Sequence, residues 1–164
     1  MELYLIRHAQ AEEHSESGGD EARALSREGR ERFRDVVRGL ERLEVQFDRV
    51  YHSPYLRAQE TADLLEPILA GETVVTAALA RAPSEELLAS LEGGSVALVG
   101  HEPWLSDLLS VLLLGWHVYE HPSRSAPFEF KKGGVARLTG KPKPGEMQLV
   151  AFWPPRTLRE LGSA

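Results

Sequence analysis

The chain has 164 residues, of which 42% are hydrophobic and 27% are charged, with a formal net charge of −6 and no cysteine. This size and composition are typical of one compact globular domain over residues 1–164, and they exclude a disordered chain. The acidic balance argues against a nucleic-acid partner, and the lack of cysteine excludes disulfides, thiolate catalysis and cysteine-bound zinc.

The chain begins with a short apolar run, Glu2–Ile6, which predicts a buried strand. The polar stretch Glu12–Ala24 follows and is predicted to be an exposed loop. Ser26 then offers an N-cap for a helix, because apolar residues recur at helical spacing from Phe33 to Leu43.

The next strand is predicted over Asp48–His52. Ser53 and Pro54 come directly after it, a cap residue followed by a proline suited to the first position of a helix. This helix is expected to run through Ala62–Leu65. The β-branched segment Thr73–Ala78 predicts a third strand.

A brief helix is expected to open at Ser84-Glu85-Glu86 and to run through Leu91. Ser95–Val99 is the clearest buried strand in the chain, and Gly100 ends it. Pro103 marks the start of another helix, which directs the apolar residues of Trp104–Leu112 inward.

The order changes after Gly115, where three strands are predicted with no helix between them. They are Phe128–Lys131, Val135–Thr139 and Met147–Trp153. The residues 155–164 are expected to form a short C-terminal tail, with at most one helical turn over Thr157–Leu161. Because strand and helix alternate before this point, we expect an α/β fold with a mostly parallel central sheet in a three-layer α/β/α sandwich.

Two features of the sequence bear on location. The N-terminus lacks the basic start and long apolar stretch of a signal peptide. The longest apolar segment, Val111–Trp116, is too short to span a bilayer. We therefore expect a cytoplasmic protein with no membrane partner; the sequence leaves its oligomeric state open.

Histidine and arginine collect at the ends of three predicted strands. Arg7 and His8 end the first, His52 and Ser53 end the second with Arg57 one turn further on, and His101 ends the fourth. The carboxyl ends of parallel strands meet at one edge of a sheet, where ligands bind. Arginines bind phosphate oxygens with permanently charged donors, and a neutral imidazole is a competent nucleophile near pH 7. A protonated second imidazole would stabilise the transition state.

Three segments resemble the motifs of the histidine phosphatase superfamily, which includes the phosphoglycerate mutases. They are Leu5-Ile6-Arg7-His8-Ala9, Ser53-Pro54-Tyr55-Leu56-Arg57-Ala58-Gln59-Glu60-Thr61-Ala62 and Val99-Gly100-His101-Glu102-Pro103. The resemblance implies a phosphoglycerate mutase-like fold and makes His8 the phosphorylated nucleophile. It also implies that Arg7, Arg57 and His101 bind the phosphate. We expect no metal or cofactor, because arginines and histidines supply the charge that a metal supplies in other enzymes. Ala9 departs from the commoner glycine.

The leaving group separates the possible substrates. An alkyl phosphate ester needs a general acid, and the only candidates in the relevant short segment are Glu85 and Glu86, which are equally explained as first-turn helix residues. Phosphohistidine expels an easily protonated imidazole, and the short loops resemble those of SixA-type phosphohistidine phosphatases. The expected substrate is therefore phosphohistidine on a signalling protein. The alternatives are a sugar-phosphate or phosphoglycerate enzyme using Glu85 or Glu86, and a non-catalytic phosphate-binding module.

The remaining polar motifs are assigned ordinary roles. His14 is expected on the surface and His52 at the sheet edge or rim. His117 and His121 are spaced as a helical metal pair, but Pro122 weakens the helix and no third ligand is evident. Solvated loop charges are expected at 123–125 and at 131–132, and the glycines at 133–134 suit either a hairpin turn or a backbone approach to ligand.

Overall fold

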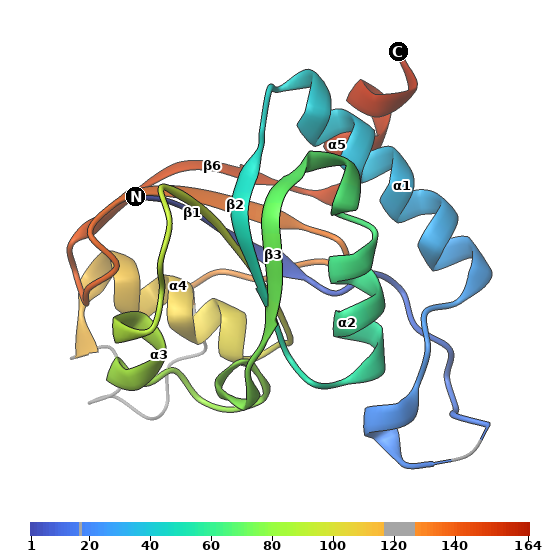
Figure 1. Cartoon of the computed structure of the whole chain (residues 1–164), viewed down its shortest axis with the longest axis horizontal. Coiled ribbons are helices and arrows are strands. Elements are labelled where there is room, and N and C mark those ends of the chain that lie inside the picture. The colour runs from blue at the N-terminus through green and yellow to red at the C-terminus, as the bar shows by residue number, and fades with distance from the viewer. Residues whose placement is uncertain (17, 117–126) are drawn as a thin grey trace.

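The computed structural model describes residues 1–16, 18–116 and 127–164, and in this part a single sheet is flanked by helices (Figure 1). The strands, in chain order, are β1 (Glu2–Arg7), β2 (Phe47–His52), β3 (Leu69–Val75), β4 (Ser95–Gly100), β5 (Val135–Gly140) and β6 (Met147–Trp153). The α helices are α1 (Arg27–Arg42), α2 (Leu56–Asp63), α3 (Glu85–Ala89), α4 (Trp104–Leu114) and α5 (Pro155–Ser163).

The sheet has the strand order β3-β2-β4-β1-β5-β6. The first four strands in this order run parallel, whereas β5 runs antiparallel to both β1 and β6. The helices α1, α2 and α5 lie on one side of the sheet and α3 and α4 on the other (Figure 1). The predicted three-layer α/β/α architecture with a mostly parallel sheet is therefore confirmed.

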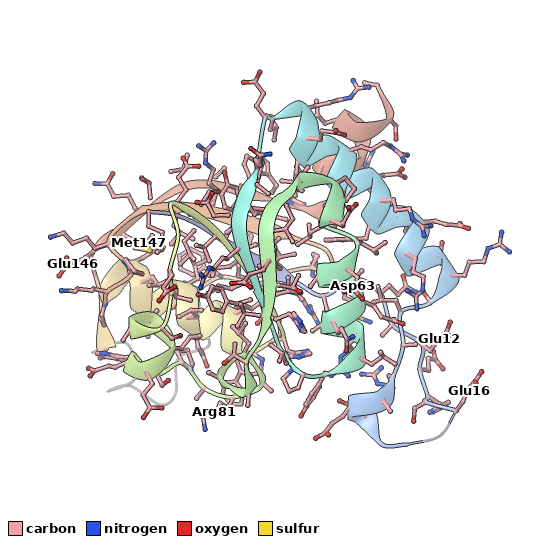
Figure 2. All side chains as sticks on the ribbon, in the orientation of Figure 1. Glu12, Glu16, Asp63, Arg81, Glu146 and Met147 are labelled. Atoms are coloured by element: carbon pink, nitrogen blue, oxygen red, sulfur yellow. The ribbon has the colours of Figure 1, made fainter. Side chains whose placement is uncertain are left out.

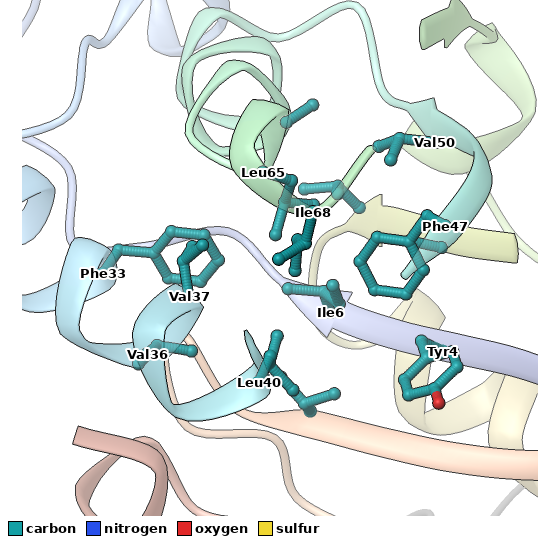
Figure 3. Packing of buried hydrophobic residues seen from close by; sticks show 14 of the residues in the cluster. Tyr4, Ile6, Phe33, Val36, Val37, Leu40, Phe47, Val50, Leu65 and Ile68 are labelled. Atoms are coloured by element: carbon teal, nitrogen blue, oxygen red, sulfur yellow. The ribbon is translucent and has the colours of Figure 1, made fainter. Parts of the chain in front are cut away.

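Each strand supplies both faces of the core because successive side chains point to opposite sides. In β1, Tyr4 and Ile6 pack with residues of α1, α2 and α5, as Figure 3 shows for part of this cluster. Leu3 and Leu5 pack instead with the leucines of α3 and α4. All four side chains are buried, so β1 is covered on both faces, as its almost continuous apolar sequence predicted.

The helix α1 begins as the sequence predicted. The hydroxyl oxygen of Ser26 accepts a hydrogen bond from the backbone N–H of Gly29 at 3.0 Å, so Ser26 is the N-cap. The C-terminal helix, in contrast, is longer than the single turn predicted over Thr157–Leu161. The helix α5 spans Pro155–Ser163, packs against α1 and buries Leu158 completely. Packing on α1 stabilises this amphipathic helix, and local helix propensity alone does not reveal that contribution.

The predicted helix start at Pro54 is wrong by two residues. The hydroxyl of Ser53 is bonded to Nε2 of His101 at 2.7 Å and to the N–H of Tyr55 at 3.3 Å, and α2 begins only at Leu56. The third strand also differs, because β3 spans Leu69–Val75 and a short 3-10 helix occupies Ala77–Ala80.

The predicted strand Phe128–Lys131 is not formed, although Phe130 is fully buried. Side chains satisfy its backbone in place of a neighbouring strand. The carbonyl of Phe130 accepts a hydrogen bond from Nη1 of Arg7 at 2.6 Å, and its N–H donates to Oε1 of Glu102 at 3.3 Å. A buried apolar residue in this segment therefore does not imply a β-strand, because side chains supply the hydrogen bonds that a neighbouring strand would supply.

None of the helices described is both long enough and apolar enough to cross a membrane.

Candidate active site

The register of the sheet places the functional strand ends side by side. Arg7 of β1 is paired with Gly100 of β4, and His52 of β2 is paired with Val99. The chain continues in this alignment past the strands, because the N–H of His8 bonds to the carbonyl of Gly100 at 3.1 Å. The N–H of Ser53 bonds in the same way to the carbonyl of Val99, also at 3.1 Å. The predicted meeting of the three motifs at one sheet edge is therefore what the structure shows.

His8 is buried directly after β1, with 6% of its surface exposed. Its Nδ1 lies 2.7 Å from the carbonyl oxygen of Ala9. A carbonyl only accepts hydrogen bonds, so Nδ1 carries the proton and Nε2 keeps its lone pair in the neutral ring. Burial lowers the pKa of His8 to about 3; the Ala9 carbonyl opposes this shift, while the charges of His101, Arg57 and Arg7 add to it.

His101 faces His8, with the two ring centroids 5.1 Å apart. Burial lowers the pKa of His101 to about 4, and the positive charges of Arg57 and Arg7 contribute to the shift. Its Nε2 is bonded to the hydroxyl of Ser53, which can donate to a neutral ring or accept from a protonated one. The ring of Tyr55 packs against the other side, 4.9 Å away between centroids.

The two arginines reach the site from different elements. Arg7 ends β1 and is anchored by the carbonyl of Phe130. Burial lowers its pKa, and the carboxylates of Glu102 and Glu129 oppose the shift. Arg57 lies in the first turn of α2 with 5% of its surface exposed, over the ring of Tyr55.

Asp20 holds Arg57 in the free protein. Its carbonyl oxygen accepts from Nη1 of Arg57 at 2.7 Å, and its Oδ2 accepts from Nη2 at 2.9 Å. Asp20 lies in a short 3-10 helix, Asp20–Ala22, on the loop that projects below α2 in Figure 1. Arg23 on the same loop pairs with Oδ1 of Asp20 at 2.7 Å. Two guanidinium groups therefore share one carboxylate at the mouth of the site.

Three buried nitrogens of these residues have no hydrogen-bond partner in the part of the chain that the structure describes. They are Nε of Arg7, Nε of Arg57 and Nδ1 of His101. Unpaired buried donors are costly in a folded protein and call for a ligand or water. An oxyanion held between the two arginines and His101 would accept hydrogen bonds from all three, so the set is suited to a phosphoryl group.

Thr61 links the first two motifs and was missed as a functional residue. Its Oγ1 accepts from the N–H of Ala9 at 3.0 Å and donates to the carbonyl of Arg57 at 2.6 Å. Thr61 belongs to the second motif, residues 53–62, so the motif could have identified it as a functional residue. Asp20 was also missed, and nothing in its polar loop distinguished it, because its role comes from a contact 37 residues away along the chain.

The remaining predictions have mixed outcomes. His52 is buried, with 7% exposed, in an interior strand and bonds through Nδ1 to the carbonyl of Ser53, so its placement at the rim was wrong. His14 is on the surface as predicted. The residues 117–126, with the histidine pair and the 123–125 cluster, lie outside the described residues. Among the residues described, no three histidine or acidic side chains gather as metal ligands.

Glu85 and Glu86 lie at the exposed start of α3. Glu86 is 3.8 Å from Arg81, and no contact joins either glutamate to the four candidate site residues within the described chain. Gly133 and Gly134 instead approach the site through backbone. The N–H of Gly133 bonds to the carbonyls of Arg7 and His8, and the carbonyl of Gly134 accepts from the N–H of Arg7.

Residues 3–81, which contain the first two of the three motifs, match the family model of the histidine phosphatase superfamily (branch 1). An uncharacterized protein of Picosynechococcus sp. (strain ATCC 27264 / PCC 7002 / PR-6) is 30% identical over 146 residues, which are 84% of this chain and 88% of the relative. The chain belongs to the histidine phosphatase superfamily. This membership supports a phosphatase activity for the site.

Solved structures agree on the phosphoglycerate mutase-like fold. The protein histidine phosphatase SixA complexed with tungstate has a TM-score of 0.78 at 23% identity, covering 96% of this chain and 99% of that one. SixA from Agrobacterium tumefaciens has a TM-score of 0.72 at 24% identity, with coverages of 93% and 96%. A phosphoserine phosphatase from Entamoeba histolytica, in complex with 3-phosphoglyceric acid, has a TM-score of 0.65 at 17% identity, with coverages of 92% and 95%. Because these sequences are less than 25% identical to this histidine phosphatase superfamily member, the similarity establishes its fold alone.

Proposed function

We propose that this chain removes phosphoryl groups from phosphohistidine on a signalling protein, through a phosphohistidine intermediate on His8. The observation that carries the proposal is the 2.7 Å hydrogen bond from Nδ1 of His8 to the carbonyl of Ala9. It leaves the Nε2 lone pair as the nucleophile in a neutral ring. The depressed pKa of His8 keeps this form populated at neutral pH.

The reaction proceeds in two in-line displacements. In the first, Nε2 of His8 forms a bond to phosphorus while the P–N bond of the substrate breaks. The substrate ring already carries a proton on its other nitrogen, so it takes the electron pair of the broken bond and leaves as neutral imidazole. In the second, a water oxygen forms a bond to phosphorus while the P–Nε2 bond breaks. This restores neutral His8 and releases inorganic phosphate, which keeps the two protons of the water. The Nε groups of Arg7 and Arg57 bind the phosphoryl oxygens in both steps, and a protonated His101 stabilises the charge of the transition state.

The carboxylates near the site support a substrate that needs little acid catalysis. Burial alone would raise the pKa of Asp20, but hydrogen bonds and charges from Arg57 and Arg23 outweigh this and lower it. Asp20 is therefore a poor proton donor. Glu102 accepts both from the hydroxyl of Ser106 and from the N–H of Phe130. A phosphoramidate with an imidazole leaving group can be cleaved without a general acid, whereas an alkyl ester needs one.

The comparisons favour the same substrate class. The structure with a TM-score of 0.78 is that of a protein histidine phosphatase, and the chains match over nearly their whole lengths. The likeness to a phosphoserine phosphatase, at 0.65, is weaker. A protein substrate requires an accessible pocket, and the carboxylate that pairs with Arg57 and Arg23 belongs to an exposed residue, Asp20.

The intermediate can be tested directly. Mixing the protein with a phosphorylated histidine phosphotransfer protein and quenching in alkali is expected to trap acid-labile phosphate on His8. His8→Ala is expected to lose both the trapped phosphate and turnover, whereas His14→Ala, which removes an exposed histidine, keeps both. Turnover that survives His8→Ala would contradict the mechanism, and binding without turnover in the wild type would make the chain a phosphate-binding module.

The substrate class needs a separate comparison. We expect a phosphohistidine protein to be hydrolysed with a higher kcat/KM than p-nitrophenyl phosphate or a panel of sugar phosphates and phosphoglycerate. Glu85→Gln and Glu86→Gln are expected to leave the phosphohistidine activity unchanged. A preference for alkyl esters that collapses in either glutamine variant would instead establish the small-molecule phosphatase or mutase.

A further inference from the structure

A second cavity lies beside the candidate active site, in the layer that holds α1 and α5. It has a volume of about 100 Å³ and is bounded by Ala9 and Gln10, by the α1 side chains around Phe33, by the turn at Lys132–Gly133 and by α5. None of Arg7, His8, Arg57 and His101 lines it. We infer that this cavity is a binding site for a short aliphatic carboxylate.

Cations gather around this cavity although the chain carries a net charge of −6. Arg32, Lys132 and Arg159 all line it. Arg32 pairs with Glu28, but Lys132 and Arg159 have no carboxylate partner among the residues described. The Nε of Arg159 is buried and lacks any hydrogen-bond partner in the same part of the chain. The buried Nε of Arg159 favours an anionic ligand because a buried unpaired donor is costly, and the exposed Lys132 adds a second positive charge to the lining.

Apart from Gln10 and two glycines, the rest of the lining is apolar, and it selects the kind of anion. Ala9, Phe33 and Val36 are buried members of the main core cluster, and Phe33 and Val36 are labelled on α1 in Figure 3. Pro155 adds a further apolar surface. Inorganic phosphate has no apolar face to cover these groups, whereas a carboxylate with an alkyl chain does. A cavity of roughly 150 Å³ accepts benzene, so the observed volume suits a smaller body such as a four-carbon chain.

The cavity shares backbone with the candidate active site. Ala9 lines it, and the carbonyl of Ala9 is the acceptor for Nδ1 of His8. Gly133 also lines it and donates its N–H to the carbonyls of Arg7 and His8. A ligand in the cavity therefore lies beside residues whose backbone orients the nucleophile, and its presence can be followed at nearby backbone amides.

The test is a titration of the intact protein with sodium butyrate at constant ionic strength and pH 7, followed by the backbone amide NMR signals of Gln10 and Gly133. We expect saturable shifts with a Kd on the order of 1 mM, typical for so few ligand atoms. Butyramide, which has the same shape without the charge, and inorganic phosphate are expected to bind this cavity at least about tenfold more weakly.

Variants connect the binding to the cavity. Arg159→Met and Lys132→Met are each expected to weaken butyrate binding by about fivefold or more, and Lys132 is exposed, so its replacement does not depend on refolding a packed side chain. Arg156→Met is the matched control, because Arg156 lies on the same helix, pairs with Glu160 and does not line the cavity. Equal binding of butyramide, absence of shifts at Gln10 and Gly133, or butyrate binding that neither variant weakens would overturn the inference.

Discussion

The Nδ1 atom of His8 lies 2.7 Å from the carbonyl oxygen of Ala9, so the residue after the nucleophile fixes the tautomer of the nucleophile itself. Ala9 is also held through its N–H, which donates a hydrogen bond to Oγ1 of Thr61. His8 is thus oriented by its own chain neighbour, and that neighbour is oriented by α2. These two hydrogen bonds connect the end of β1 to α2.

The depressed pKa values of His8 and His101 make stability fall in acid. In the unfolded chain both rings titrate near their ordinary pKa of about 6.5, whereas in the folded protein they do so at about 3 and about 4. Between these values the unfolded state binds more protons, so stability is lost as pH falls below about 6.5. From pH 7 to 5 the loss is about 2 kcal/mol per histidine.

Urea denaturation at the two pH values measures this loss. His8→Asn and His101→Asn are each expected to reduce the difference in unfolding free energy between pH 7 and 5. The control His14→Asn, at an exposed position, leaves it unchanged. Equal pH dependence in the wild type and both site variants would show that the rings are not buried in neutral form.

Oxyanion binding is expected to protonate His101. Burial lowers the pKa of this ring, and the positive charges of Arg57 and Arg7 lower it further. A bound dianion neutralises these charges, raises the pKa and draws in up to about one proton at neutral pH. Calorimetric titration with tungstate in buffers of different ionisation enthalpy measures the uptake. His101→Asn should abolish it, and uptake that persists in this variant would assign the proton to another group.

Thr61→Val is expected to impair catalysis while keeping the shape of the side chain. It leaves the buried N–H of Ala9 without its acceptor, at a cost of about 1–3 kcal/mol in unfolding free energy. We expect kcat to fall by about tenfold or more, because misplacing the nucleophile weakens the positioning that the site supplies. Thr61→Ser retains the hydroxyl and should recover most of the activity. Equal loss in both variants would point to packing of the methyl group instead.

Asp20→Asn is expected to tighten the binding of phosphate. The Asp20 carboxylate occupies Arg57 and adds negative charge at the mouth of the site. The amide keeps an acceptor for Arg57 but removes that charge, which is worth about 1 kcal/mol, or about fivefold in Kd, at an exposed position. Glu12→Gln is the control, since Glu12 lies on the same loop without a side-chain contact to Arg57, as labelled in Figure 2. Weaker binding in Asp20→Asn would mean that the charge chiefly orients Arg57.

Gly39→Ala is expected to destabilise the fold through the contact between α1 and α5. A Cβ at Gly39 would lie 2.1 Å from the carbonyl oxygen of Leu158, so the helices would have to separate. Overpacking of this kind costs about 1–3 kcal/mol in unfolding free energy. Alanine has a higher helix propensity than glycine by about 1 kcal/mol, so we expect the overpacking to outweigh this gain. Gly19→Ala is the control, because its Cβ would meet nothing within 4 Å. Denaturant unfolding compares the two, and an unchanged Gly39→Ala midpoint would contradict the close packing.

The sequence by itself determined the alternation of strand and helix, the first five element positions to within a few residues and the three motifs at strand ends. These features are local, because apolar periodicity, caps and turns leave their pattern in neighbouring residues. It also determined that Arg7, His8, Arg57 and His101 meet, since parallel strand ends share one edge of a sheet.

Only the tertiary structure decided the features that depend on partners distant in sequence. Phe128–Lys131 is irregular because Arg7 and Glu102 satisfy the backbone of Phe130, and α5 is a full helix because α1 covers it. The hold of Asp20 on Arg57 comes from a loop with no distinguishing pattern. Hydrogen bonds across such separations form once the sheet has aligned the segments, so their geometry leaves no periodic trace along the chain.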